Sequence, residues 1–451
     1  MTDLLETKVL YLPIGRKTFD LVAGEEKREE SSSFLNSIVK EVVEPENIIT
    51  SPEELEAFLS TVDCDSIVTT IYQSVTFADG EFILSVISRV KAPVVVWSVR
   101  EPSVGGRLRL NSLTGGNSTS HTLRSENHSY SFVFGNAPEA QVQNTIKVKL
   151  SVHQVVQKLQ LLKIGVIGKH PPGFFFSDTN DELLHKKLGP TVSYFDLQNA
   201  FEECVKLPRS RWEGMIERAE KQVIGLNRSD ETVKKFAQFS TYVKEMIEQE
   251  GITAIAVRCW PDFFNELGAA ACSTLSQFTE DGIVSSCESD IHGSISMFIL
   301  RELSHGSAPY LGDMVHINEA SNSAVFWHCG AGAYSLAHPE TGAKVGVHPN
   351  RKLGFTMEFG LKPGPVTLFR LGYTKADGYR LLVMRGQALD TPQRFNGTSV
   401  EVKLETVVNE TLYKLMEEGF EPHYAIVYDD VVEELIELGR QLSIETTVFI
   451  N

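Results

Sequence analysis

Runs of β-branched residues that alternate with helical segments are the feature that most limits how this chain can fold. Residues 66–72 and 93–99 are nearly continuous in Val, Ile and Thr, which is typical of strands buried on both faces. Residues 8–14 form an earlier strand, and residues 51–60 open with a helix-capping pattern, Ser-Pro-Glu-Glu. The first third of the chain is therefore predicted to be a doubly wound α/β domain.

The same alternation starts again after a long amphipathic helix that ends near residue 162. The predicted strands of this second region are 163–168, 253–258 and 282–286. Each is followed by a helix, which favours a second parallel sheet. After about residue 305, short β-like runs separated by Gly and Pro favour an antiparallel sheet or small barrel, and the tail returns to α/β. The predicted domains are 1–162, 163–305 and 306–451.

Charge and cysteine content narrow the class of protein. The 451 residues include 42 Lys and Arg against 59 Asp and Glu, so the net charge of −17 repels nucleic acid and anionic membranes. No apolar run is long enough for a transmembrane helix, and residues 1–6 lack a signal-peptide pattern. The six cysteines form no CxxC pair, which indicates free thiols. We expect a cytoplasmic protein that binds a small molecule.

Two carboxylates and one histidine are the candidate metal ligands. Glu266 and Asp290 each follow a predicted strand, and open α/β sheets bind ligands outside the carboxyl ends of their strands. Neighbouring parallel strands lie about 4.8 Å apart, so the two acids can share one ion. With the imidazole of His423 they form the donor set of a hard or borderline divalent cation. The structural alternatives are a cap of the following helix by Glu288, Ser289 or Asp290, a surface position for Glu266, and a structural or solvent-facing position for His423.

Several motifs resemble the metal-site region of the L-fucose/L-arabinose isomerase-like family. They are ELGAAACS (266–273), CESDIHGSISM (287–297), KPGPVT (362–367) and GFEPHYAIV (419–427), and the likeness runs in order along essentially the whole chain. The resemblance implies that Glu266, Asp290 and His423 bind a divalent ion, usually Mn²⁺, with Mg²⁺, Co²⁺ or Fe²⁺ as substitutes. It also implies that the two acids are catalytic and transfer protons. The implied fold has two flavodoxin-like domains and a β-rich C-terminal domain.

Other residues are weaker candidates for contacts with a sugar. The candidate substrate-binding residues are Arg109, Asn117, His121, Trp260, His328 and Arg370. The first three lie in a stretch that resembles a family segment completing a neighbour's active site. This implies a homo-oligomer, a trimer or hexamer, with the active site near a subunit interface. A helix start for that stretch, and structural or exposed positions for His328 and Arg370, are the alternatives.

The predicted activity is the interconversion of an aldose and a ketose, an intramolecular oxidoreduction. It would proceed by proton transfer through a metal-stabilised cis-enediolate. The chain is shorter than a typical fucose isomerase and resembles a compact branch of the family, to which sulfoquinovose isomerases belong. The expected substrate is a six-carbon aldose, most specifically sulfoquinovose, converted to 6-deoxy-6-sulfofructose. The alternatives are L-fucose or L-arabinose-type sugars, a non-catalytic sugar-binding protein, a metal-dependent aldolase or lyase, and a relative that has lost catalysis.

Overall fold

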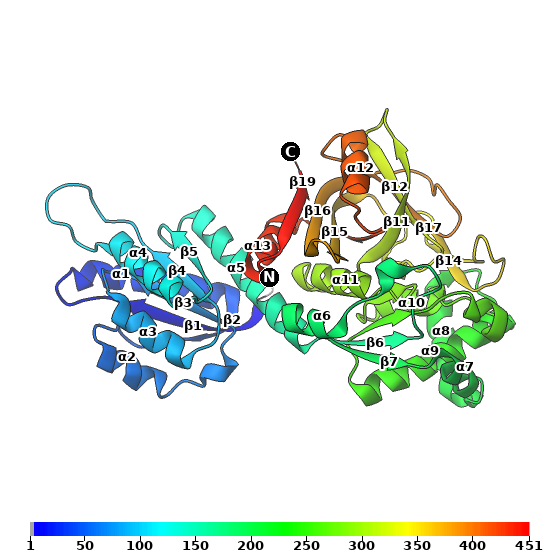
Figure 1. Cartoon of the computed structure of the whole chain (residues 1–451), viewed down its shortest axis with the longest axis horizontal. Helices are drawn as coiled ribbons and strands as arrows, with labels where there is room; N and C mark the ends of the chain where they lie inside the picture. The colour runs from blue at the N-terminus through cyan, green and yellow to red at the C-terminus, as the bar shows by residue number, and fades with distance from the viewer. Residues whose placement is uncertain (1–3, 451) are drawn as a thin grey trace. The chain divides into compact units, whose positions relative to one another are not determined.

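The structure, a computed structural model, describes residues 4–450 and separates into two units, Met1–Gln157 and Lys158–Asn451 (Figure 1). The division into three domains remains a prediction. Residues 1–3, on which the expectation of no signal peptide partly rests, lie outside the described residues. Among residues 4–450, no helix has the length and apolar character needed to cross a membrane.

The first unit is built on a five-stranded sheet in the order β2-β1-β3-β4-β5, with every strand parallel to its neighbours. Its elements are β1 Leu5–Ile14, α1 Leu21–Ile38, β2 Val39–Val43, α2 Pro52–Leu59, η1 Cys64–Ser66, β3 Thr69–Ser74, α3 Gly80–Arg89, β4 Val94–Ser98, α4 Ser112–Ser125, β5 Tyr130–Phe134 and α5 Ala140–Leu161. The parallel α/β domain predicted from the β-branched runs is confirmed.

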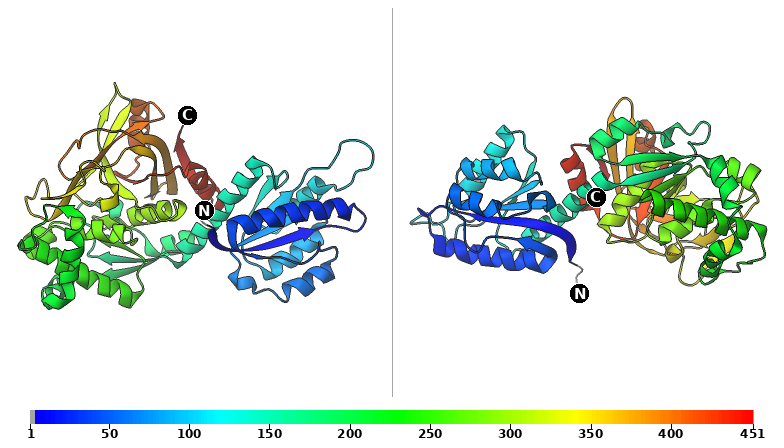
Figure 2. Two further views of the ribbon diagram at one scale, coloured as in Figure 1. Left: turned by 180° about the vertical axis from the view of Figure 1, so that it is seen from behind. Right: turned by 90° about the horizontal axis from the view of Figure 1, so that it is seen from below.

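Alternating side chains of β1 explain why this sheet carries helices on both faces (Figure 2). Leu10 and Leu12 pack in a core with residues of α2, α3 and α4, whereas Val9 and Tyr11 pack with α1 and α5. Successive side chains of a strand point to opposite faces, so a strand buried twice needs apolar residues at nearly every position. Full burial of each large apolar side chain contributes about 1.5–3 kcal/mol.

The second unit begins with a four-stranded parallel sheet in the order β10-β9-β6-β7. The elements of this part are β6 Lys163–Ile167, η2 Phe175–Ser177, α6 Asp181–Leu188, β7 Thr191–Phe195, α7 Leu197–Cys204, α8 Arg209–Glu220, β8 Val223–Ile224, α9 Glu231–Glu250, β9 Ala254–Val257, η3 Phe263–Leu267, α10 Cys272–Glu280, β10 Ser285–Cys287 and α11 Ile291–Leu303. Residues of α7, α9 and α10 form one core with this sheet.

A closed antiparallel barrel makes up most of the remaining chain. The order β16-β15-β18-β11-β12-β17 closes through a further pairing of β16 with β17, which gives six strands. The elements of this part are β11 Tyr310–Asn318, β12 Ser323–His328, η4 Tyr334–Leu336, β13 Ala343–Gly346, β14 Thr356–Gly360, β15 Gly364–Thr374, β16 Gly378–Ala388, β17 Thr398–Leu404, α12 Val408–Glu417, β18 His423–Val427, α13 Val432–Leu442 and β19 Glu445–Phe449. The predicted β-rich C-terminal region is confirmed.

Helix α11 connects the parallel sheet to the barrel, because it contacts β9 and β10 as well as β15 and β18. It is buried almost all round, and its serines bond to both sides. Ser294 Oγ donates to the carbonyl of Ile255 in the sheet (2.8 Å), and Ser296 Oγ accepts from the backbone N–H of Leu371 in the barrel (2.9 Å). The N-terminus of α11 is thereby fixed beside the strands that carry Arg370 and His423.

Candidate metal and proton-transfer site

A tight turn between β10 and α11 carries the two acidic residues closest to His423. Glu288 and Ser289 both have left-handed backbone conformations, with φ of 58° and 54°. Such conformations cost non-glycine residues about 1–3 kcal/mol each, so the surroundings must hold them. The backbone N–H of Ser289 donates to the carbonyl of Val257 (3.1 Å), and that of Asp290 donates to Cys287 (3.1 Å). The turn therefore directs Glu288 and Asp290 to different sides of His423.

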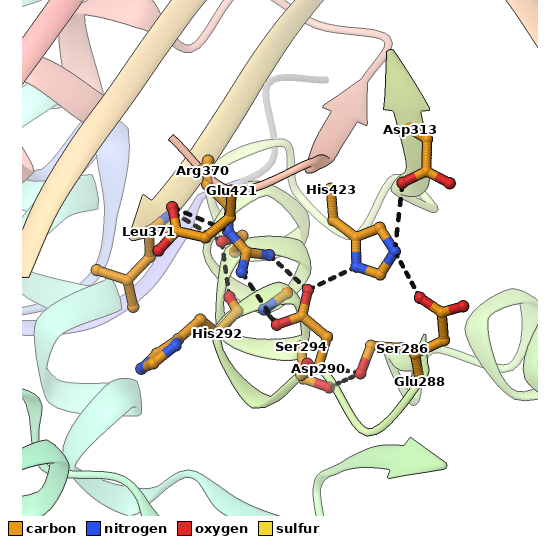
Figure 3. A network of polar contacts seen from close by, with 12 residues as sticks. Ser286, Glu288, Asp290, His292, Ser294, Asp313, Arg370, Leu371, Glu421 and His423 are labelled. Atoms are coloured by element: carbon orange, nitrogen blue, oxygen red, sulfur yellow. Dashed lines mark hydrogen bonds and ion pairs between the residues drawn. The ribbon is translucent and has the colours of Figure 1, made fainter. Parts of the chain in front are cut away.

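Asp290 is fully buried, and each of its oxygens has partners (Figure 3). Oδ1 accepts the backbone N–H of Gly293 at 2.8 Å, so Asp290 caps α11, as the structural alternative predicted. Arg370 donates to both oxygens, at 2.6 and 3.1 Å, and Nδ1 of His423 lies 2.8 Å from Oδ2. A Cβ on Gly293 would lie 2.5 Å from Oδ2, so only glycine fits there.

The electrostatic setting of Asp290 favours the carboxylate. Burial by itself would raise the pKa of Asp290, but the Arg370 charge and the hydrogen bond with His423 hold it well below its usual range. Arg370 is equally buried; burial lowers its pKa, but the Asp290 charge outweighs that effect and raises it. Asp290 and Arg370 therefore form a buried, bidentate ion pair. Removal of either side chain leaves the other charge buried without a partner.

His423 begins β18 and faces acids on both sides of its ring (Figure 3). Its Nε2 lies 3.2 Å from Oε2 of Glu288 and 3.5 Å from Oδ1 of Asp313, which is its cross-strand partner on β11. Burial of the ring lowers the pKa of His423, but hydrogen bonds with Asp290 and Glu288 outweigh it and raise the pKa to about 10. The ring position therefore favours a positive charge.

The Nε2 side of the ring is the more open one. The side chains of Glu288 and Asp313 keep 16% and 31% of their exposure, against 0% for Asp290. Burial still raises the pKa of Asp313, an effect that His423 partly offsets. Trp260 Nε1 donates to Oε1 of Glu288 at 3.1 Å and fixes this side chain. Two carboxylates and one imidazole nitrogen thus converge where solvent still has access.

Aromatic side chains from the loop after β6 cover the same site. The ring of Phe176 meets His423 edge-on with centroids 5.1 Å apart, and Phe174 meets Trp260 at 5.2 Å. Edge-to-face contacts of this kind are favourable and exclude water. They shield the imidazole, which is only 1% exposed, and leave the acids at the rim.

Glu266 comes from a different element of the second unit. It is exposed on the π-helix η3, which follows β9 after a short loop. Among the described residues, no hydrogen bond or ion pair joins Glu266 to Asp290 or His423. Its roles as metal ligand and catalytic acid remain predictions, whereas Asp290 and His423 are brought together.

The predicted substrate-binding residues fall into two groups. Arg109, Asn117 and His121 belong to the first unit: Arg109 pairs with Asp20 at 2.9 Å, and the other two are exposed on α4. Trp260 and Arg370, described above, both contact acids of the site in the second unit. For this first group the alternative of a helix start is confirmed, since α4 begins at Ser112.

His328 is buried, and its ring centroid lies 5.7 Å from that of His423. Its Nδ1 lies 3.2 Å from the sulfur of Cys329. Hydrogen bonds from Cys272 and Cys287 lower the pKa of the Cys329 thiol well below its ordinary value. His328 therefore lies between the acids around His423 and a group of cysteines.

Sequence reasoning missed Glu288 and Asp313 as site residues. The sequence predicts Glu288 only as a possible helix cap, although its position two residues before Asp290 is a usable signal. Asp313 has no such signal in the sequence. It lies near His423 because β11 pairs with β18 in a register that places the two residues opposite each other, although they are 110 positions apart in the chain (423 − 313 = 110). Cross-strand register of that separation is not encoded in a local pattern.

Comparison with known proteins agrees with this architecture. Residues 351–449 match the family model described as L-fucose isomerase, C-terminal domain. A relative from Priestia aryabhattai is 63% identical over 98% of this chain and 99% of its own, and one from Alkalicoccus urumqiensis is 59% identical over 96% and 97%. This chain belongs to the L-fucose isomerase-like family. The predicted family and the predicted class of enzyme, an isomerase, are thereby confirmed.

A more distant relative extends the same conclusion. A protein from Clostridium sp. (strain MSTE9) is 38% identical over 98% of this chain and 99% of its own. All three relatives bear the name sulfoquinovose isomerase. A solved structure of D-threo-3-hydroxyaspartate dehydratase from Delftia sp. HT23 aligns with 10% identity, 95% and 85% coverage and a TM-score of 0.14, too low to inform the fold.

Proposed function

We propose that this protein is a divalent-metal-dependent aldose–ketose isomerase that converts sulfoquinovose to 6-deoxy-6-sulfofructose. The assignment of sulfoquinovose as the substrate rests on the 63% identity, over 98% of the chain, to a relative named sulfoquinovose isomerase. Substrate specificity within a family depends on the lining of one site, and relatives this similar share most of that lining. The acids around His423 support the chemistry.

The donor types around His423 suit a divalent cation, which would have to draw Glu288 and Asp313 together, because these two acids and His423 are not among the groups whose ligand atoms all lie within 4.8 Å of one another. Glu288 and Asp313 offer carboxylate oxygens beside Nε2 of the ring, and the raised pKa of His423, about 10, shows that a positive charge is favoured there. Oxygen donors with one imidazole suit Mn²⁺, with Mg²⁺, Co²⁺ or Fe²⁺ as substitutes. A bound ion of this kind polarises the carbonyl and hydroxyl oxygens of a sugar and makes the proton on the intervening carbon easier to remove.

The proposed ligands are Glu266, Asp290 and His423, to which the geometry adds Glu288 and Asp313. Asp290 would have to give up Arg370 or His423 in order to bind an ion directly, because both its oxygens are engaged. In the described arrangement it holds Nδ1 and directs Nε2 outward, which is the usual way a carboxylate orients a metal-binding histidine. Asp290 then acts at least as a positioning residue.

The proton transfers follow from the aldose–ketose conversion itself. A base removes the proton from C2 of the aldose and an acid returns one to C1, while the hydroxyl proton passes from O2 to O1. Glu266 and Asp290 are the proposed proton-transfer groups, and Glu288 is a further candidate because it is partly exposed and lies 3.2 Å from Nε2 of His423. A carboxylate held far below its ordinary pKa, as Asp290 is, makes a weak base. The intermediate is an enediolate.

A sulfonate requires fixed cationic donors near the site. Arg370 is committed to Asp290, so another guanidinium is needed. Arg351 is exposed, and its guanidinium carbon lies 5.5 Å from the ring centroid of Trp260. The indole N–H of the same Trp260 donates a hydrogen bond to Glu288. We propose Arg351 as a sulfonate donor; Arg351→Gln should raise KM for sulfoquinovose and leave KM for a neutral aldose unchanged.

Three further expectations belong to this proposal. The first sheet has the strand order 2-1-3-4-5 of flavodoxin-like domains. When the strands of the second sheet are numbered along the chain, their order is 2-1-3-4, which is the same order without the last strand. This supports two flavodoxin-like domains. A homo-oligomer with Arg109, Asn117 and His121 completing a neighbour's site, and a cytoplasmic location, remain part of the proposed function.

The deciding experiment follows product formation by NMR in D₂O. Manganese-loaded protein is incubated with sulfoquinovose, glucose, L-fucose and L-arabinose in parallel. We expect turnover of sulfoquinovose to a ketose that carries solvent deuterium at C1, since a proton-transfer route exchanges with solvent. An unlabelled ketose would point to a hydride shift, and binding without turnover would leave a sugar-binding protein.

A further inference from the structure

A cluster of cysteines adjoins the acids around His423. Five cysteines of the second unit are buried. Apart from Cys204 in α7, they come from separate elements: Cys259 follows β9, Cys272 begins α10, Cys287 ends β10 and Cys329 follows β12. Interaction with the Cys259 and Cys329 thiols raises the pKa of the Cys287 thiol well above its ordinary value. Buried thiols scattered in sequence have been gathered into one place by the fold, which a role in simple packing does not require.

Three of these groups offer ligand atoms at metal-binding separations. The ligand atoms of Cys287, His328 and Cys329 all lie within 4.8 Å of one another, and all three residues are buried. The sulfur of Cys329 lies 3.2 Å from Nδ1 of His328 and 3.4 Å from the sulfur of Cys272. We call Cys272, Cys287, His328 and Cys329 the thiol cluster.

These distances can be compared with those of a tetrahedral zinc site. With Zn–S bonds of about 2.3 Å and a Zn–N bond of about 2.0–2.1 Å, tetrahedral angles place two sulfurs ~3.8 Å apart and a sulfur and nitrogen ~3.6 Å apart. The observed separations of 3.4 Å between Cys272 and Cys329 and 3.2 Å between Cys329 and His328 are each about 0.4 Å shorter. These two pairs have to spread by a few tenths of an ångström to admit an ion, and Cys272 has to move closer to the other ligands, because it lies outside the group whose ligand atoms are all within 4.8 Å of one another. A disulfide would need the sulfurs at about 2.05 Å.

The chemistry of the ligands distinguishes this cluster from the neighbouring acids. Thiolates and imidazole select soft or borderline ions such as Zn²⁺, whereas carboxylates select Mn²⁺ and Mg²⁺. His328 separates the two groups, with its ring 5.7 Å from that of His423. The fold thus places a soft donor set and a hard donor set side by side without mixing their ligands.

We propose that the thiol cluster is a second metal site, which takes one thiophilic ion of the zinc class through Cys287, His328 and Cys329. Binding through Nδ1 of His328 requires release of the Cys329 backbone N–H that Nδ1 now accepts at 2.9 Å. Cys272, 3.4 Å from the Cys329 sulfur, can move toward the ion and close the fourth tetrahedral position, as in structural zinc sites. Such an ion would tie α10, β10 and β12 together behind the acids. The proposal does not depend on the proposed isomerase activity.

Cadmium is the probe, because its thiolate complexes absorb in the ultraviolet, where free thiols are transparent. Full-length protein is stripped with a chelator, its thiols are kept reduced under nitrogen, and Cd²⁺ is titrated in. We expect a thiolate-to-cadmium band that saturates at one equivalent and survives an excess of Mn²⁺. Absence of the band, or its displacement by Mn²⁺, would overturn the proposal.

Matched variants locate the ion. Cys329→Ser and Cys287→Ser should each weaken Cd²⁺ binding at least about 100-fold, beyond what loss of an outer-shell partner causes. Cys64→Ser, a half-buried thiol of the first unit, is the control and should keep the band. His423→Gln should keep it too, which separates this site from the acids around His423. A band that persists in both cluster variants would contradict the assignment.

A measurement on the unmodified protein covers the case in which a variant fails to fold. Cd²⁺ should protect Cys272, Cys287 and Cys329 from alkylation, mapped by mass spectrometry after brief exposure in mild denaturant, while Cys204 reacts as before. Protection confined to other cysteines would overturn the proposal. Recovery of a Cys272–Cys329 disulfide in place of cadmium binding would do the same and assign the cluster to redox chemistry.

Discussion

The two edges of the His423 ring differ in almost every respect. On the Nδ1 side, Asp290 is fully buried, held by Arg370, and bonded at every oxygen. On the Nε2 side, Glu288 and Asp313 are partly exposed and lie 3.2 and 3.5 Å from the nitrogen. The ring separates a closed scaffold from an open acidic face.

This contrast indicates how the site is divided between stability and chemistry. A buried, fully bonded ion pair fixes geometry but is costly to disturb, because any broken bond leaves a charge in a low-dielectric interior. An open face can exchange a proton, an ion or a sugar without that cost. The closed side should therefore respond to substitution chiefly in stability, and the open side chiefly in binding and turnover.

The largest effect is expected from Arg370→Met on the closed side. The change leaves the Asp290 carboxylate buried without its cation, which should lower the free energy of unfolding by about 3–5 kcal/mol. Urea denaturation at neutral pH measures it. Arg385→Met is the control, since this half-exposed arginine pairs with Glu405 and Asp430 at the surface and should cost about 0–1 kcal/mol. Equal costs would show that the closed side is not a scaffold.

The pH dependence of the metal-free protein should be the next largest effect. The pKa of His423 is raised to about 10 from its ordinary value of 6.5, so the folded state binds this proton more tightly than the unfolded state. The stabilisation is complete below about pH 6.5 and is lost as the pH rises through about 10, at no more than about 1.4 kcal/mol per pH unit. Urea denaturation at a series of pH values measures the decline.

The control for that pH dependence is His423→Gln, which has no ring proton to lose. Its free energy of unfolding should decline less than that of the parent over the same alkaline range, because the raised pKa of His328, about 9, still contributes. On the acid side the sign reverses: the lowered pKa of Asp290 contributes stability above its ordinary value of 3.8, which is lost as the pH falls. A variant that declines between pH 6.5 and 10 as steeply as the parent would locate the titration elsewhere.

On the open side, Glu288→Gln should weaken Mn²⁺ binding by about 10–100-fold. The substitution removes a charge 3.2 Å from Nε2 and leaves the buried pair intact, so the free energy of unfolding should change little. Titration calorimetry of chelator-treated protein measures the affinity. Glu213→Gln, a pair of Arg209 on the surface helix α8, is the control.

The same titration on Glu266→Gln tests which acid binds the ion: Glu266, which the family resemblance implies, or Glu288, which the geometry favours. Loss of affinity in both variants would place Glu266 and Glu288 on one ion after a local rearrangement of η3. Loss in Glu288→Gln alone would remove Glu266 from the ligand set. If neither variant changes the affinity, the Nε2 edge is not the metal site.

The fold was largely predictable because its signals are local. Near-continuous β-branched runs such as those of β3 and β4 occur only in strands covered on both faces, and they predicted the parallel sheet directly. The closure of the barrel was not predictable in the same way. It rests on the pairing of β16 with β17, which depends on how several hairpins close together.

The candidate site was predictable only in part, for the same reason. Asp290 sits at a strand end just before a helix, a position the sequence marks. Its partner Arg370 is 80 positions away (370 − 290 = 80), and nothing near Arg370 distinguishes a buried guanidinium from an exposed one on a strand. Long-range pairing of charges is decided by packing, not by spacing.

The smallest effect is expected from Trp260→Phe, which probes how the open side is ordered. The change removes the indole N–H that donates to Glu288 at 3.1 Å but keeps a ring against Phe174. One hydrogen bond is worth about 0.5–1.5 kcal/mol, so Mn²⁺ affinity should fall by no more than about tenfold. If Trp260 acts through Glu288, the double variant with Glu288→Gln should bind Mn²⁺ no more weakly than Glu288→Gln alone, since the indole then has no carboxylate to orient. Additive losses would instead assign Trp260 a contact of its own with the bound ion or its waters, and the open face would then extend from Glu288 to the indole.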